Sequence, residues 1–204
     1  MTTSVAVTGL GVVAPHGDDA QAMFAALLRG ESALRPVFPE LPTPAAAASV
    51  GFDPARWFTK LQLAGVDRVS QLAVAAADLA LHDAGVDLAR RAAGVDPAVR
   101  IGGALDDLDR ERVGVYVGCG MGGATALEAA YRSSGGRVPP LTIPAFMPNA
   151  PAAHVAMRHG VLGPVLTYSV ACASSAVAIA EAAAAIQRGD IDLAIAGGSE
   201  ALIV

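Results

Sequence analysis

Residues 165–196 have the sequence VLTYSVACASSAVAIAEAAAAIQRGDIDLAIA. The β-branched run at 165–170 predicts a strand, and the alanine-rich residues 173–188 predict a helix that Gly189 ends. A further strand is expected at 191–196. Since two strands joined through a helix usually lie parallel in one sheet, this stretch predicts an α/β layered fold with a mainly parallel sheet.

The rest of the chain continues this alternation of strands and helices. Buried strands are expected at the β-branched runs 4–8 and 112–118. The clearest amphipathic helix spans 67–84 and ends at Gly85. Further helices are expected from a cap at Asp18 or Asp19 to Arg29, at 125–132 and at 150–158, and loops or exposed segments at 35–56, 86–111 and 133–148.

Composition limits the class of protein. The chain of 204 residues is 53% hydrophobic and 16% charged, which excludes intrinsic disorder. Its net charge is −5 and the basic residues are scattered, so nucleic acid is not expected as a partner. No apolar run is long enough for a membrane span, and the first residues, MTTSVAVTGLG, lack a signal-peptide pattern. Two cysteines make no disulfide framework, so free thiols and a cytoplasmic location are expected.

Cys172 is the candidate nucleophile, because it lies between a predicted strand and the start of a predicted helix. The dipole and free N–H groups at a helix start favour the thiolate, the reactive form of cysteine. The small neighbours Ala171, Ala173, Ser174 and Ser175 would let an acyl group approach the backbone, and the Cys172 N–H could be one oxyanion donor. The alternative is a small buried hydrophobic residue, as free cysteines commonly are.

Four stretches together resemble the β-ketoacyl-acyl-carrier-protein synthases, the condensing enzymes of fatty-acid and polyketide synthesis. The most specific is the segment 149–201, with ACASS followed by RGDIDLAIAGGSEA. The others are VAVTGLGVVAPHG at 5–17, DRVSQLAVAAADLALHDAG at 67–85 and RVGVYVGCGMGG at 112–123. The resemblance covers nearly the whole chain and is weakest at 33–60 and 86–110.

The resemblance implies a thiolase-like layered αβαβα fold built from two related halves. This chain, 1–204, would be the amino-terminal domain only, with the carboxy-terminal half absent, and would form a homodimer or heterodimer. Val204 comes soon after Gly-Gly-Ser-Glu, without a polar tail, so we expect a cut at that point and an apolar face where the second half would pack.

The resemblance also implies a reaction and partners. The cysteine accepts an acyl chain from an acyl-carrier-protein thioester, malonyl-carrier protein is decarboxylated, and its carbanion attacks the acyl thioester. No metal or organic cofactor is implied. The family's two histidines and lysine belong to the carboxy-terminal half, and none of the four histidines or Lys60 matches them. Only Cys172 therefore carries over as a catalytic residue.

Met121 lies in GCGMGG at a position that faces the acyl pocket in this family, so it is a candidate substrate-binding residue. Ordinary core packing is the alternative for Met121. Phe146 and Met147 could line either the pocket or a dimer interface. A basic surface for an acidic carrier protein could come from scattered side chains, namely Arg56, Lys60, Arg68, Arg132 and Arg137.

Three other functions stay open at this point. The glycine patterns at 9–14 and 118–123 loosely fit a dinucleotide-binding turn, but tight turns and close packing explain them more simply. A non-catalytic partner of the chain-length-factor type, or an inactive truncated synthase, is the main alternative, although such partners typically lack the cysteine. A degradative thiolase would have a different motif around Cys172.

Overall fold

A computed structural model describes residues 4–40, 42–43, 45–86, 108–133 and 138–203. The elements in chain order are α1 (Ala20–Leu28), β1 (Arg35–Val37), β2 (Ala45–Ala47), the 3₁₀ helix η1 (Pro54–Arg56), α2 (Arg68–Asp83), the 3₁₀ helix η2 (Arg110–Arg112), β3 (Val113–Gly118), α4 (Ala124–Arg132), α5 (Thr142–Phe146), α6 (Ala150–His159), β4 (Val165–Tyr168), α7 (Ser174–Arg188) and β5 (Leu193–Gly198). Most of the predicted helices and strands are therefore confirmed.

The central sheet has three strands in the order β4-β3-β5, and both pairs run parallel. Val115 in the middle strand lies beside Val165 of β4 and Ile195 of β5. Every residue of β3 is buried, whereas Val165 and Leu166 of the edge strand β4 are 40% and 43% exposed. The mainly parallel sheet predicted from the sequence is confirmed.

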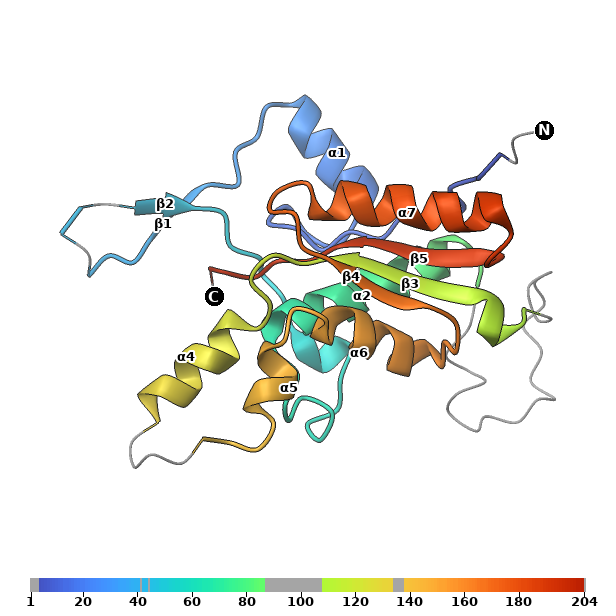
Figure 1. Ribbon diagram of the computed structural model, residues 1–204. Coiled ribbons are helices and arrows are strands. Elements are labelled where there is room, and N and C mark those ends of the chain that lie inside the picture. The colour runs from blue at the N-terminus through green and yellow to red at the C-terminus, as the bar shows by residue number, and fades with distance from the viewer. Residues whose placement is uncertain (1–3, 41, 44, 87–107, 134–137, 204) are drawn as a thin grey trace.

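Helices cover both faces of this sheet (Figure 1). α7 packs on one face, and α2 and α6 pack together on the other. Because successive side chains of a strand point to opposite faces, Val115 and Val117 join the core formed with α2 and α6, whereas Tyr116 packs under α7. The carboxyl ends of all three strands and the start of α7 therefore meet at one end of the sheet, where a site is expected in an open α/β fold.

Local capping explains the helix boundaries. Asp19 and Asp67 accept hydrogen bonds from the backbone N–H groups of Ala22 and Val69, and so cap α1 and α2. Gly85 and Gly189 come after α2 and α7 in the left-handed conformation that ends a helix without a Cβ clash. These ends agree with the sequence-based expectation.

The strand predicted at 4–8 is wrong. These residues belong to neither described sheet, and Val7 is 79% exposed. The next residues pack on α2 instead: a Cβ at Gly9 would lie 2.2 Å from the Ala80 carbonyl oxygen, and the Leu10 N–H donates to Asp83. A β-branched run favours extended backbone, but a strand also needs a neighbouring strand with free ladder groups.

Two segments expected to be irregular contain short elements. The 35–56 segment holds the antiparallel pair β1–β2, with Pro36 opposite Ala46, and η1. The 133–148 segment holds α5, where Pro144 lies in the first turn, a position at which its missing N–H costs no hydrogen bond. Most of 86–111 lies outside the described residues.

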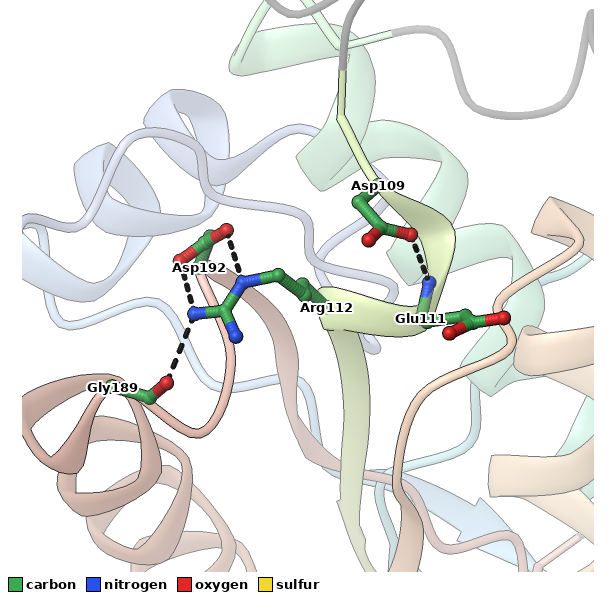
Figure 2. A network of polar contacts seen from close by, with 5 residues as sticks. All are labelled: Asp109, Glu111, Arg112, Gly189 and Asp192. Carbon is green, nitrogen blue, oxygen red and sulfur yellow. Dashed lines mark hydrogen bonds and ion pairs between the residues drawn. The ribbon is translucent and has the colours of Figure 1, made fainter.

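At the opposite end of the sheet, Arg112 connects β3 with the loop between α7 and β5 (Figure 2). Its Nε and Nη2 donate to the two carboxylate oxygens of Asp192 at 2.7 Å each, and Nη2 also donates to the Gly189 carbonyl. The hydrogen bond from Arg112 lowers the pKa of Asp192. This exposed pair joins the start of β3 to the connection between α7 and β5, at the amino ends of the strands.

Candidate active site

Cys172 lies on a sharp turn between β4 and α7, and its side chain is exposed. The residue before it, Ala171, has φ of +50°, a conformation that L residues other than glycine rarely adopt. Such strain costs of order 1–3 kcal/mol and persists only where the surroundings enforce it, typically at functional sites. The predicted strand-turn-helix arrangement is present, and Cys172 is exposed among the residues that the structure describes.

Ser174 holds the strained turn closed. Its hydroxyl accepts a hydrogen bond from the Val170 N–H at 2.8 Å and donates one to the Ala171 carbonyl at 2.7 Å. Ser174 is 5% exposed, so both bonds are shielded from competing water. Sequence reasoning identified Ser174 only as a small residue. A hydroxyl residue two positions after a candidate nucleophile, at a helix start, was the available signal.

Two glycines let the start of α7 approach the sheet. A Cβ at Gly118, the last residue of β3, would lie 2.3 Å from the Ser174 carbonyl carbon. A Cβ at Gly198, the last residue of β5, would lie 2.6 Å from the Ser175 Cβ. Close helix–sheet packing therefore explains Gly198 and Gly118, the first glycine of GCGMGG.

Met121 lies in the turn after β3, at the same end of the sheet as Cys172, and is 57% exposed. Its N–H and that of Gly120 both donate to Oε2 of Glu200, at 3.1 and 3.0 Å. Within the described ranges, the Met121 side chain is not packed in the core. Sequence reasoning missed Glu200, although an acidic residue two positions after the end of a predicted apolar strand and its glycines was a detectable signal.

Cys119 occupies the same turn but has a different environment. It is 1% exposed and packs with Val69, Leu72 and Ala201. Burial raises the pKa of the Cys119 thiol, and the negative charge of Glu200 adds to this. Cys119 therefore has the properties of a structural cysteine.

Two histidines, His159 and His16, contact groups that do not belong to the Cys172 turn. His159 is buried between α2 and α6, with Nε2 3.1 Å from Oδ1 of Asp78, whose other oxygen accepts from Arg158. His16 contacts the Glu31 carbonyl. Among the described residues, no group of three or more potential ligands could hold a metal ion.

Three of the scattered arginines are already engaged. Arg56 pairs with Asp18 and Arg132 with Glu128, while Arg68 donates to the Val50 and Phe52 carbonyls. Arg137 lies outside the described residues. The contacts of these arginines therefore do not favour a dedicated basic surface.

The comparisons with known proteins agree with this geometry. The family described as "Beta-ketoacyl synthase, N-terminal domain" matches residues 2–204. The chain belongs to the β-ketoacyl synthase family. The three-layer arrangement of α7, the sheet and α2 with α6 is the thiolase-like α/β fold of the amino-terminal half of such synthases.

Several curated relatives that match this chain are about twice as long. Nodulation protein E of Rhizobium sp. (strain N33) is 34% identical over 100% of this chain and 48% of its own length. The 3-oxoacyl-[acyl-carrier-protein] synthase 2 of Rhizobium meliloti (strain 1021) is 33% identical over 98% of this chain and 47% of its own length. A solved β-ketoacyl synthase from Burkholderia phymatum STM815 is 29% identical with a TM-score of 0.78, covering 100% of this chain and 48% of the other. The chain thus spans about half the length of the curated relatives it matches. No described helix is both long and apolar enough to cross a bilayer.

Proposed function

We propose that this chain provides the acyl-accepting centre of a β-ketoacyl-acyl-carrier-protein synthase, with Cys172 as the nucleophile. The observation that carries the proposal is the exposed thiol on a strained turn at the start of α7. Strain is retained there because Ser174 and the glycine-lined contact with the sheet enforce one backbone conformation. A fixed nucleophile needs no reorganisation before it attacks.

The first step is a thioester exchange. The Cys172 thiolate attacks the carbonyl carbon of an acyl thioester, and the negative charge moves to the carbonyl oxygen. The Cys172 N–H at the start of α7 is one donor to that oxyanion. The bond between the carbonyl carbon and the donor sulfur then breaks, and the donor leaves as a thiol after taking up a proton. The acyl group remains on Sγ of Cys172.

The second step, in this proposal, is condensation with a carbanion from malonyl-carrier protein. Decarboxylation releases CO₂, and the carbanion displaces the acyl group from Cys172 as a β-ketoacyl product. The histidines and lysine that the family uses have no counterpart among the four histidines and single lysine of this chain. The chain alone should therefore accept an acyl group without condensing it.

We further propose an acyl-carrier protein as donor, a dimeric assembly and a cytoplasmic location. The donor is suggested by the name of the Rhizobium meliloti relative. Two free cysteines support a reducing compartment. A dimer is supported by exposed apolar side chains near α4 and α5, among them Tyr131, Ile143 and Met147.

The acyl-transfer proposal is tested by incubating the chain with an octanoyl thioester of carrier protein and following both products. We expect one free thiol released per chain and one octanoyl mass gained. The gain should disappear in Cys172→Ala and persist in the matched control Cys119→Ala. Thiol release that is unchanged in Cys172→Ala would contradict the proposal.

A further inference from the structure

The Glu200 carboxylate, which comes after β5, binds the turn that follows β3. Its Oε2 accepts hydrogen bonds from the N–H groups of Gly120 and Met121 at 3.0 and 3.1 Å. Glu200 comes after β5, whereas Gly120 and Met121 come after β3. Hydrogen bonds to an ionised acceptor are stronger and shorter than neutral ones. One side chain therefore fixes the backbone of two successive residues in the neighbouring turn.

The backbone that carries Glu200 is itself anchored on two sides. The N–H of Ser199 donates to the Gly118 carbonyl at 3.0 Å, which extends the pairing of β5 with β3. The Ser199 hydroxyl donates to the Val69 carbonyl of α2 at 2.8 Å. Glu200 is thus held at a defined position relative to the sheet and α2.

The absence of a side chain at Gly120 makes room for the carboxylate. A Cβ at Gly120 would lie 2.9 Å from Oε2 of Glu200, closer than real Cβ atoms approach. Since Oε2 is the end of a flexible side chain, an alanine there would displace the carboxylate and leave the strand in place. Glu200 can therefore bind this turn only because Gly120 has no side chain.

Met121 is the second of the two residues whose N–H groups Glu200 binds. Its side chain is 57% exposed, so surrounding side chains hold it only in part. The turn of Met121 and the turn of Cys172 leave the same end of the sheet, because Gly118 of β3 pairs with Tyr168 of β4. The start of the Met121 turn is also bonded to the end of β4, because the Cys119 N–H donates to the Tyr168 carbonyl at 3.0 Å.

We propose that Glu200 is a positioning residue for Met121, which fixes the direction in which the Met121 side chain meets an acyl chain on Cys172 and so sets the preferred acyl length. This inference rests on the proposed function, because Met121 matters to the reaction only if an acyl chain is held at Cys172. Glu200 itself touches no reacting atom.

The test measures how fast Cys172 reacts with maleimides that carry methyl or octyl chains. This reaction needs no carrier protein and no condensation, so it is separate from the test of acyl transfer. Peptide mapping assigns each adduct to Cys172. The readout is the ratio of the octyl rate to the methyl rate, which a general loss of stability would not change.

We expect Met121→Ala and Glu200→Ala each to change this ratio about tenfold. Such a change corresponds to a difference of about 1.4 kcal/mol between the interactions of the octyl and methyl chains. The double variant should show no more than the larger single effect, because both changes act on the same side chain. Glu200→Gln keeps an oxygen acceptor and should restore the original ratio. Gly120→Ala displaces the carboxylate and should shift the ratio in the same direction as Glu200→Ala.

Three results would overturn the inference: an unchanged ratio in Glu200→Ala, additive effects in the double variant, or equal effects of Gln and Ala at position 200. Failure of octanoyl transfer together with the expected ratios would instead contradict the proposed function and leave the orienting role of Glu200 intact.

Discussion

The turns after β3 and β4 leave the same end of the sheet, and each carries one cysteine. Cys119 is 1% exposed and its pKa is raised by burial, whereas Cys172 is exposed beside a strained residue. Cys119 packs against Val69 and Leu72 of α2, whereas Cys172 lies on the turn that leads into the 15-residue helix α7. Residue type alone therefore does not identify a nucleophile, because the packing around each cysteine decides its exposure.

The largest expected effect is the difference in reactivity between the two thiols. With iodoacetamide under native conditions, Cys172 should be alkylated at least on the order of a thousandfold faster than Cys119, since Cys119 reacts only when the surrounding core opens. In denaturant the two rates should become similar. Peptide-resolved mass spectrometry measures both in one sample. Comparable alkylation rates of Cys119 and Cys172 in the native chain would contradict the difference in their exposure.

Gly118 lies where β3 contacts the start of α7, and we expect any side chain added there to lower the stability of the fold. Gly118→Ala places a Cβ against the backbone of Ser174 and Ser175, and overpacking of this kind should cost roughly 1–3 kcal/mol or more in unfolding free energy. Gly197→Ala is the matched control, because a Cβ there meets no atom within 4 Å, and it should be neutral or stabilising by up to about 1 kcal/mol. Urea unfolding measures both. Equal costs would argue against close packing at Gly118.

The strained turn should depend on Ser174. Ser174→Ala removes both hydrogen bonds of the hydroxyl and leaves the Val170 N–H without that partner, which should cost about 1–3 kcal/mol. Ser175→Ala should stay within about 0.5 kcal/mol, because no side-chain hydrogen bond of Ser175 is found in the described part of the chain. The experiment also compares acyl transfer, which should slow in Ser174→Ala alone. Unchanged stability would show that the turn is closed without the hydroxyl.

The smallest expected effect is on alkaline stability. Because the native pKa of Cys119 is raised above the unfolded value of about 8.5, the native state holds its proton to a higher pH. The buried thiol therefore contributes stability that is complete below the unfolded pKa and is lost as pH rises through the folded pKa. Cys119→Ala should therefore flatten the fall in stability above pH ~8.5 relative to the original chain. Identical alkaline slopes would contradict the effect of burial on Cys119.

The sequence was sufficient to predict the helices and strands that have a local sequence signal, such as apolar periodicity or a glycine at the end. α2 and α7 have periodic apolar faces and glycine ends, and the run before Gly118 is apolar throughout, as a strand buried on both faces requires. The strand predicted at 4–8 failed because pairing is not a local property. α5 was missed since a Gly/Pro-rich segment favours a loop, although Pro144 is tolerated in a first helical turn.

The candidate site was predictable in part for the same reason. Cys172 could be identified from a strand-turn-helix pattern that lies within about 30 residues of sequence, the length of one such unit. Ser174 as the residue that closes the turn and Glu200 as the partner of Gly120 depend on side-chain geometry, and Glu200 is 80 positions away from Gly120. Contacts between strands far apart in sequence have no periodic signal.

The most direct test of the central claim is the location of an acyl group after the native chain meets an octanoyl thioester of carrier protein. Tandem mass spectrometry of the digested product resolves the peptides that contain Cys119 and Cys172. The predicted result is an octanoyl group on Cys172 with Cys119 unmodified. An octanoyl group on Cys119 with none on Cys172 would contradict the assignment of Cys172 as the acyl acceptor.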